Sequence, residues 1–193
     1  MTEAKDHAAL APSAWIVRFA HLVPMYAQVL DLAAGHGRHA RLFASRRARV
    51  LAVDRDAAAL AMLAGVQGIE TTIADLETGT WPFHDARFDA IVVTNYLHRP
   101  LFPHLLAALA DDGVLLYETF AAGNERFGRP SNPGFLLRAG ELLDVVRGRL
   151  TVVAFEQGEV GAERPAVVQR LAAVGPNRPW PPAIGVADSL PPP

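Results

Sequence analysis

The sequence has 193 residues, of which 51% are hydrophobic, and its formal net charge is −2 at pH 7. This length and apolar content predict one globular unit with a sizeable core, and the near-neutral charge argues against a large nucleic-acid-binding surface. The absence of cysteine excludes disulfides, thiolate zinc sites and a thiolate nucleophile. No apolar run approaches the ~20 residues of a membrane span, and residues 1–7 lack a signal-peptide pattern, so we expect a cytoplasmic protein without membrane contact.

The two ends of the chain differ in composition from the rest. Residues 1–11 are polar and alanine-rich and are predicted to form a loose lead-in. Residues 176–193 are rich in proline and are predicted to form a tail without regular structure. Residues 12–175 are predicted to form a single domain, which begins with an amphipathic helix that closes at Pro24.

The stretch that organises the sequence is residues 29–40, an apolar run that leads through a small-residue turn into a helical pattern. The run carries Asp31 near its end, and the turn carries Gly35 and Gly37. A buried strand that enters a helix through glycines presents backbone N–H groups to a ligand, and a Cβ there would block the ligand or forbid the required φ. The carboxylate of Asp31 would repel a pyrophosphate but suits a cationic amino-acid group.

Two further acids follow the next two predicted strands. The apolar run at 50–53 ends in Asp54, 17 residues past Gly37, where a carboxylate can hold two ribose hydroxyls. Arg55 comes next and lies either beside an adenine edge or in solvent. The third strand ends at Asp75, whose carboxylate can accept a hydrogen bond from an adenine amine. Acids at three successive strand tips fit a ligand with an ammonium group, a ribose diol and an adenine, which is S-adenosylmethionine.

The fourth predicted strand, at 90–94, ends where the strand order of a doubly wound sheet reverses, and such points form the ligand crevice. Asn95, Tyr96 and His98 therefore stand where the sulfonium methyl group should lie. The remaining elements are predicted as a helix at 56–64, a turn at 111–113, a strand at 114–120, a helix at 140–146, and two strands at 150–156 and 165–173 joined by a turn at 158–163.

A long polar loop, residues 121–135, leaves the fifth strand on the ligand side. Long loops in compact domains are usually either functional or disordered. We expect Asn124, Arg126 and Arg129 to contribute to the acceptor site, where the two arginines could hold an anionic group through bidentate contacts. In the alternative interpretation the arginines pair with nearby acids, Glu118 among them, and only fasten the loop.

The motifs of the first half also resemble those of a known family. Residues 31–37 match the glycine loop Asp-x-Gly-x-Gly-x-Gly except at Ala33, and the runs at 88–93 and 111–116 match the family's fourth and fifth strands. The sequence thus resembles the class I S-adenosylmethionine-dependent methyltransferases, and is similar to their small bacterial tellurite-resistance-like group. The resemblance implies an α/β fold with a Rossmann-like, doubly wound, seven-stranded sheet, mostly parallel with an antiparallel last strand. Ala33 replaces the first family glycine, which we expect to be tolerated through a negative φ.

The motifs and the resemblance together assign candidate site residues. The predicted cofactor-binding residues are Asp31, Ala33, Gly35, Gly37, Asp54, Arg55, Asp75, Leu76 and Asn95. A general base is needed only if the acceptor must lose a proton, and the candidates are His98, Tyr96, Tyr117 and Glu118, although His98 could instead cap the following helix. The candidates for acceptor binding are Tyr96, Asn124, Arg126 and Arg129. No metal is expected, because His36 and His39 lack a recognisable third ligand.

The predicted function is methyl transfer from S-adenosylmethionine to a small-molecule acceptor by in-line displacement, in which proximity and orientation supply much of the catalysis. Nucleic-acid methylation is not expected, because the sequence has neither Asn-Pro-Pro-Tyr after the fourth strand nor a cysteine nucleophile. One alternative is an NAD-binding oxidoreductase, which the spacing of Gly35, Gly37 and Ala40 fits, although Asp31 and Asp75 would then have no role. Another is a non-catalytic module that binds S-adenosylmethionine. A monomer and a homodimer both fit the sequence.

Overall fold

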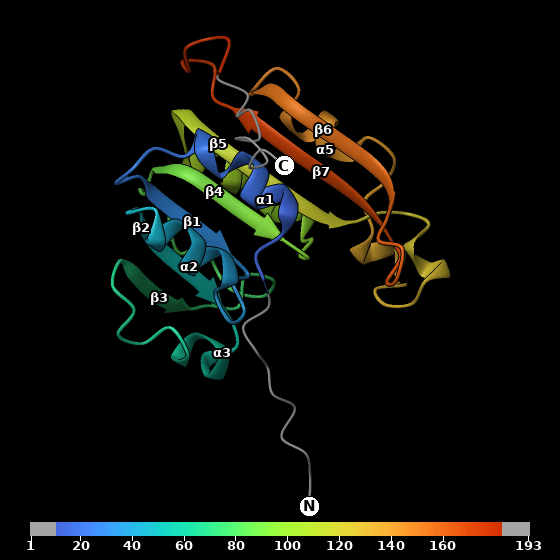
Figure 1. Cartoon of the computed structure of the whole chain (residues 1–193), viewed down its shortest axis with the longest axis horizontal. Coiled ribbons are helices and arrows are strands. Elements are labelled where there is room, and N and C mark those ends of the chain that lie inside the picture. The colour runs from blue at the N-terminus through green and yellow to red at the C-terminus, as the bar shows by residue number, and fades with distance from the viewer. Residues whose placement is uncertain (1–10, 183–193) are drawn as a thin grey trace, which may run out of the picture.

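One seven-stranded sheet forms the centre of the computed structural model, which describes residues 11–182 (Figure 1). Its strands are β1 (Gln28–Leu32), β2 (Arg49–Asp54), β3 (Ile69–Ile73), β4 (Phe88–Thr94), β5 (Leu109–Phe120), β6 (Thr151–Val160) and β7 (Ala166–Val174). Their order is β3-β2-β1-β4-β5-β7-β6. The pairs among β1 to β5 are parallel, whereas β7 is antiparallel to both β5 and β6. The predicted doubly wound sheet with an antiparallel last strand is confirmed.

Helices cover both faces of this sheet. They are α1 (Ala14–Phe19), α2 (Arg38–Ser45), α3 (Ala57–Ala61), α4 (Phe102–Ala108) and α5 (Glu141–Val146), with short 3-10 helices η1 (Ala20–Leu22), η2 (Arg99–Leu101), η3 (Asn124–Arg126) and η4 (Pro133–Phe135). The apolar residues of α1, α2 and α3 belong to one core cluster, and those of α4 and α5 belong to a second cluster on the opposite face. Figure 1 shows α1 and α2 in front of the sheet.

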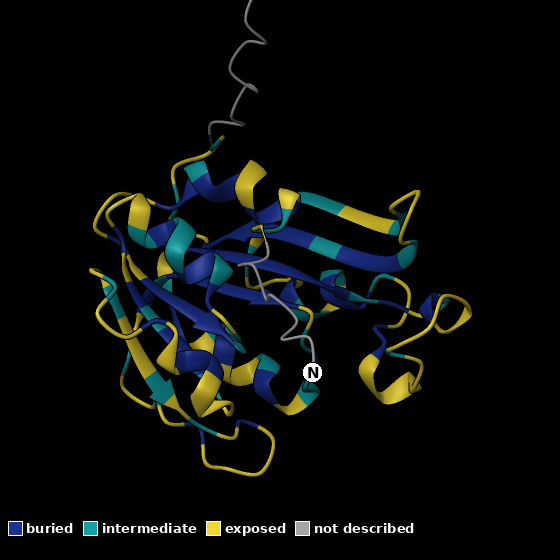
Figure 2. Ribbon diagram, turned by 60° about the horizontal axis from the view of Figure 1, so that its bottom comes forward, coloured by how far each residue is buried: buried dark blue, intermediate teal, exposed yellow. Residues whose placement is uncertain are grey.

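The central strands are buried on both faces, which explains their nearly continuous apolar sequence. In β4, Ala90 and Val92 pack in the α1–α3 cluster, whereas Ile91 and Val93 pack in the α4–α5 cluster. All four are fully buried. The edge strand β6, by contrast, is partly exposed along its length (Figure 2). Polar groups in the middle of the sheet are therefore restricted to positions at or near the strand ends.

The connection from β3 to β4, residues 74–87, contains no helix. An aromatic cluster takes the place of one. The ring of Trp81 stacks on His104 of α4 at a centroid distance of 5.5 Å and meets Phe83 edge-on at 5.1 Å, and Phe83 in turn meets Phe88 at 5.9 Å. These contacts pack the aromatic residues of the connection on the body of the protein.

Several predicted boundaries differ from the structure. β3 ends at Ile73, two residues before Asp75, because the Asp75 side chain accepts the N–H of Glu77 (2.9 Å) and turns the chain. α3 ends at Ala61 and not at residue 64. The β6–β7 hairpin is longer than predicted, since β6 continues to Val160.

The turn predicted at 111–113 is wrong, because these residues lie within β5. The pairing of β5 with β4 is irregular here, and other partners complete it. The carbonyl oxygens of Asp111 and Gly113 accept hydrogen bonds from the backbone N–H groups of Asn177 (3.0 Å) and Gly175 (2.8 Å). A local Asp-Asp-Gly sequence that favours a turn is thus held in extended form by a segment more than 60 residues away.

The first residues of the predicted proline-rich tail also pack on the body. The guanidinium of Arg178 donates to the carbonyl oxygens of Asp112 and Leu22. This contact ties the end of β7 to the helices of the N-terminal segment. The rest of the predicted tail, residues 183–193, and residues 1–10 of the predicted lead-in lie outside the described residues.

The long loop after β5 is fastened by Arg99, which lies on the connection from β4 to α4. Its guanidinium donates to the carbonyl oxygens of Gly134 and Leu136 (2.8 Å each) and to both carboxylate oxygens of Glu141 (2.6 and 2.9 Å). Glu141 is only 5% exposed. Burial raises the pKa of Glu141, but the hydrogen bonds from Arg99 and from the backbone of Arg138 outweigh burial and hold this pKa below its ordinary value.

Replacing Arg99 with Ala should lower the free energy of unfolding by on the order of 2 kcal/mol, because Glu141 stays buried without its partner. Amide-exchange protection should fall at residues 133–137. Arg147→Ala is the matched control, since it removes an exposed ion pair with Asp144 of the same helix and should cost less than about 1 kcal/mol. Urea unfolding measures both, and equal losses would contradict the fastening role.

Candidate functional site

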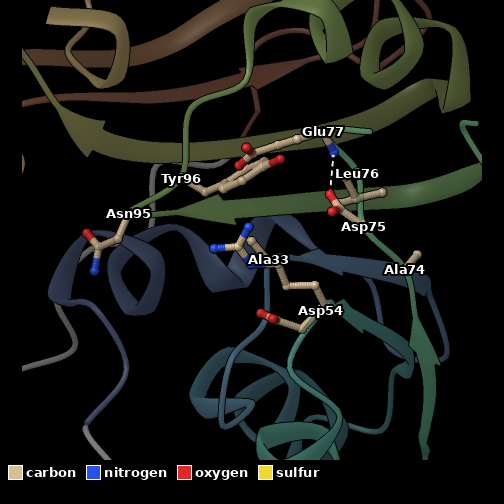
Figure 3. Close-up of a pocket in the computed structure, with 9 residues that line it drawn as sticks. Ala33, Asp54, Ala74, Asp75, Leu76, Glu77, Asn95 and Tyr96 are labelled. Carbon is tan, nitrogen blue, oxygen red and sulfur yellow. Dashed lines mark hydrogen bonds between the residues drawn. The ribbon is translucent and has the colours of Figure 1, made fainter. Parts of the chain in front are cut away.

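A pocket of about 270 Å³ opens at the carboxyl ends of four parallel strands (Figure 3). Each wall follows one strand: residue 33 follows β1, residues 54–55 end β2, residues 74–77 follow β3, and residues 95–96 follow β4. The strand order reverses between β1 and β4, so the pocket lies at the topological switch point where open α/β sheets bind ligands. The lining residues are Ala33, Asp54, Arg55, Ala74, Asp75, Leu76, Glu77, Asn95 and Tyr96.

Most of the residues predicted for the cofactor meet at this pocket, as does the acceptor candidate Tyr96. Asp31, Gly35 and Gly37 do not line it. Conversely, sequence reasoning missed Ala74 and Glu77. Glu77 could have been predicted from its position two residues after Asp75. An acid at a strand end often accepts a backbone N–H from two residues later, and the resulting turn returns the chain toward the carboxyl edge of the sheet.

The glycine turn and Asp54 form one hydrogen-bonded unit. Gly35 and Gly37 have φ values of +53° and +72°, in the left-handed region that favours glycine. A Cβ at Gly37 would lie 2.5 Å from the methyl groups of Leu63, which is itself buried. The N–H of Gly35 donates to one carboxylate oxygen of Asp54 (2.7 Å), and the N–H of Asp56 donates to the other (2.9 Å).

The negative φ expected at Ala33 is wrong, because the residue has a φ of +54°. The chain must turn there so that the N–H of Ala34 can donate to the carbonyl oxygen of Val53 (2.9 Å), and the N–H of Gly37 then donates to the carbonyl oxygen of Ala34 (2.9 Å). The Cβ of Ala33 therefore sits in a conformation that costs an L-residue roughly 1–2 kcal/mol. The glycine turn stores strain at the position where the family pattern has glycine.

Asp31 lies behind the glycine turn and does not line the pocket. It is 1% exposed, and one carboxylate oxygen accepts the N–H of Ala40 in the first turn of α2 (2.8 Å). Burial raises the pKa of Asp31 to about 7, although the Ala40 hydrogen bond and the charge of Arg38 oppose the increase. This acid is therefore partly protonated near neutral pH.

Acidic groups outnumber basic ones on the pocket wall, where Asp54, Asp75 and Glu77 face the single cation Arg55. Hydrogen bonds from the residues that follow Asp75, together with the charge of Arg55, lower the pKa of Asp75. Burial and the charges of Glu77 and Asp75 raise the pKa of Tyr96 to about 12. The phenol of Tyr96 is thus a hydrogen-bond donor at neutral pH, which makes it a poor base.

The other base candidates are occupied elsewhere. Glu118 is buried, accepts hydrogen bonds from Ser13 Oγ (3.0 and 3.1 Å) and forms an ion pair with Arg170 Nε (2.7 Å), so its predicted pairing with the loop arginines is wrong. The Arg170 N–H is not aligned with the carboxylate, and this contact is an ion pair without a hydrogen bond. Tyr117 is buried and donates to the carbonyl oxygen of Tyr96 (2.9 Å).

His98 directly precedes η2, at its N-cap position, but its side chain makes no capping hydrogen bond, so its alternative role as a helix cap is wrong. It is half-buried and does not line the pocket.

The loop candidates for the acceptor do not reach the pocket either. Asn124 is 2% exposed; its amide donates to the carbonyl oxygen of Pro130 (3.0 Å) and accepts the N–H of Val167 (3.1 Å). Arg126 is exposed, pairs with Glu159 (3.4 Å) and stacks on the neighbouring ring of Phe127, and Arg129 is exposed. The expectation that Asn124 binds a ligand is contradicted by its burial, since it holds the loop to β7.

Across residues 11–182, no group of three or more His, Cys, Asp or Glu side chains is arranged to hold a metal ion. Over the same residues, no helix has the length and apolar character that a membrane crossing requires.

The first half of the chain, with most of the pocket, is similar to a known family. Residues 29–112 match the family model described as a methyltransferase domain. Over these residues the chain is similar to a methyltransferase domain. The matched residues begin in β1, include the pocket residues that follow β1 to β4, and end in β5. None of the curated proteins matches the sequence.

Solved methyltransferase structures share the fold. The structure of TehB from Haemophilus influenzae superposes with a TM-score of 0.72 at 18% identity. The aligned region covers 89% of this chain and 65% of the TehB chain, so this chain spans less than two thirds of the length of TehB. A TehB-like S-adenosylmethionine-dependent methyltransferase from Corynebacterium glutamicum gives 0.61 at 18% identity, with 83% and 86% covered. An S-adenosylmethionine-dependent methyltransferase from Mesorhizobium loti gives 0.62 at 17%, with 84% and 98% covered.

The match over residues 29–112 and the TehB-like neighbours thus support the resemblance to class I S-adenosylmethionine-dependent methyltransferases. The family match supports the enzyme class, and the solved structures support the fold. The pocket lies where this fold reverses its strand order.

Replacing Ala33 with Gly should stabilise the protein by up to about 1 kcal/mol, because relief of the positive φ exceeds the added entropy of the unfolded chain. Gly35→Ala is the matched control, because it adds a Cβ in the same turn from which Ala33→Gly removes one. A Cβ at Gly35 meets no atom within 4 Å, so only its φ of +53° opposes the change, and about 1 kcal/mol should be lost. Thermal unfolding measures both, and a loss in Ala33→Gly would contradict strain at Ala33.

Two buried groups should contribute opposite pH dependences to the stability of the protein. Burial, with the charge of Arg38, lowers the pKa of His39 from 6.5 to about 3, so the folded state stays neutral where the unfolded chain binds a proton. Stability from His39 is therefore lost as pH falls from 6.5 towards 3. Asp31 stays protonated in the folded state up to about pH 7, whereas the unfolded chain ionises above 3.8, so stability from Asp31 is lost as pH rises through that window.

The two slopes, each about 1.4 kcal/mol per pH unit, should nearly cancel between about pH 4 and 6.5. Asp31→Asn, which keeps an acceptor for Ala40, should lose stability as pH falls through this range. His39→Gln should instead lose stability as pH rises through it. Urea unfolding at several pH values tests both, and parallel profiles for the two variants would contradict the assignment.

Proposed function

We propose that this methyltransferase transfers the methyl group of S-adenosylmethionine to a small-molecule acceptor by in-line displacement, in a single cytoplasmic domain that spans residues 12–175. The observation that supports the proposal best is the pocket at the switch point. It combines the strand-tip acids Asp54 and Asp75 with a strained glycine turn, and Asn95 and Tyr96 form its far wall (Figure 3).

The residues of the pocket fit the polar parts of the cofactor. Asp54 would hold the ribose diol, and its bond to the Gly35 N–H already orients the carboxylate along the turn. Asp75 would accept a hydrogen bond from the adenine amine, with Arg55 and Leu76 beside the ring. The methionine end would lie over the glycine turn. Asp31 would lie behind the turn near the ammonium group, whose positive charge would favour the ionised form of the buried carboxyl.

The charge of the pocket separates the proposal from the NAD alternative. Three carboxylates face one arginine on the pocket wall, which gives the site a net negative charge. S-adenosylmethionine carries a sulfonium and an ammonium group against one carboxylate and is attracted to such a wall. The pyrophosphate of NAD would be repelled, since like charges close together in a shielded site cost several kcal/mol.

The acceptor is proposed to bind beside Asn95 and Tyr96, and not at the 121–135 loop, because these two residues line the pocket and the loop residues do not. When bound, S-adenosylmethionine supplies an electrophilic methyl carbon attached to a good leaving group. The chain then needs mainly to hold the acceptor in line with that carbon and to exclude water. The protonated Tyr96 phenol can donate a hydrogen bond that orients an acceptor oxygen or nitrogen.

Titration calorimetry tests the cofactor assignment. Wild-type protein should bind S-adenosylhomocysteine and not NAD. Asp54→Ala should weaken S-adenosylhomocysteine binding by about 1.5–3 kcal/mol for each charge-assisted hydrogen bond to the ribose. Binding of a 2′,3′-dideoxy analogue should change much less, because its ribose lacks both partners. Equal losses for the two ligands would contradict the role of Asp54.

A panel of small-molecule acceptors, read as release of S-adenosylhomocysteine, tests turnover. Turnover with at least one acceptor supports the enzyme over a non-catalytic module. Tight cofactor binding without turnover across a broad panel would favour the module.

A further inference from the structure

A cluster of hydrogen-bonded polar residues surrounds Ser13, the residue that caps the N-terminus of α1. The backbone N–H of Ser13 donates to His39 Nε2 (3.1 Å), and its hydroxyl donates to the carboxylate of Glu118 (3.0 and 3.1 Å). On the other side of the ring, His39 Nδ1 lies 3.3 Å from Thr94 Oγ1. His39 is 2% exposed, and Thr94 and Glu118 are also buried. None of these four residues lines the cofactor pocket.

The hydrogen-bond directions at His39 follow from its partners. A backbone N–H can only donate, so Nε2 must be unprotonated and accept the hydrogen bond from Ser13. Burial keeps the ring neutral, since the pKa of His39 is lowered to about 3. The single ring proton therefore lies on Nδ1 and is donated to Thr94 Oγ1. One neutral imidazole thus bridges the N-terminal segment and the end of β4.

The elements that carry the other three residues of this cluster, α2, β4 and β5, also position the cofactor pocket. His39 lies in α2 two residues after Gly37, the last residue of the glycine turn. Thr94 directly precedes Asn95, which lines the pocket with a φ of +54°. The carbonyl oxygen of Glu118 accepts the N–H of Asn95 (2.9 Å). A displacement of the N-terminal segment would therefore be transmitted to both sides of the switch point.

We propose that His39 is a positioning residue that couples the seating of residues 11–13 to cofactor binding. It holds the Ser13 backbone against the first turn of α2, where Arg38 also donates to the carbonyl oxygen of Ala11 (3.4 Å). The same ring holds the β4 tip through Thr94. Coupling between two sites is reciprocal. A bound cofactor therefore stabilises the packed position of residues 11–13, and loss of that packing lowers the affinity for the cofactor by the same factor. The inference rests on the proposed cofactor pocket.

Two substitutions separate the two hydrogen bonds of the ring. In His39→Gln the side-chain amide reaches the position of Nε2 and can accept from Ser13, while the donor to Thr94 is lost. In His39→Asn the shorter amide reaches the position of Nδ1 and can donate to Thr94, while the acceptor for Ser13 is lost. His104→Gln serves as the control, because His104 lies on α4, on the opposite face of the sheet.

Amide hydrogen exchange at Ser13 and along α1 is measured with and without S-adenosylhomocysteine, together with the affinity for this ligand. In wild type and in His104→Gln, the ligand should slow exchange at Ser13. His39→Asn should lose at least tenfold in Ser13 protection and bind the ligand about 5- to 20-fold more weakly, with a thermal midpoint close to that of His39→Gln. His39→Gln should retain Ser13 protection and most of the affinity.

The outcomes distinguish this inference from the proposed function. Unchanged Ser13 protection in His39→Asn, or lost protection with ligand affinity within twofold of wild type, would overturn the positioning role alone. Failure of the wild-type protein to bind S-adenosylhomocysteine would overturn the proposed pocket and, with it, the coupling.

Discussion

The burial of the central strands on both faces is the constraint on which the rest of the structure depends. β1 and β4 have helices on each side, so their middle positions accept only apolar side chains. Charged groups are left to the strand ends, and because the strands are parallel their carboxyl ends meet at one edge. Asp54, Asp75 and Asn95 follow three different strands and are brought to one pocket in this way.

The three acids at the strand tips are not equivalent, because they lie at different depths. Asp31 precedes the last residue of β1 and is buried, Asp54 is the last residue of β2, and Asp75 lies two residues beyond β3 and is exposed. Depth determines the protonation state. Burial raises the pKa of Asp31, whereas backbone N–H groups lower that of Asp75. The wall that carries Asp75 therefore keeps its negative charge, whereas the charge of Asp31 behind the glycine turn depends on the groups around it.

Buried polar residues outside the pocket hold the connections that surround it. Glu141 with Arg99 fastens the loop after β5, and Glu118 with Ser13 and Arg170 fastens the start of α1. Each carboxylate is buried and would be costly without its partners. The methyltransferase fold is shared with TehB at 18% identity, which indicates that the pattern of burial, more than the identity of individual residues, specifies the sheet.

The sequence by itself determined the glycine turn and the positions of the strand-tip acids, because apolar periodicity and strand-ending acids are local features of the chain. The doubly wound arrangement of the strands followed from the resemblance of its motifs to a known family. Only the tertiary structure decided the φ of Ala33, the extended form of residues 111–113 and the partners of Glu118 and Asn124. Each of these depends on a hydrogen bond to another segment: Ala34 with Val53, β5 with residues 175–177, Glu118 with Ser13, and Asn124 with Val167. A local pattern carries no information about such partners, since they are separated from it by 19 to 105 residues and meet only when the sheet closes.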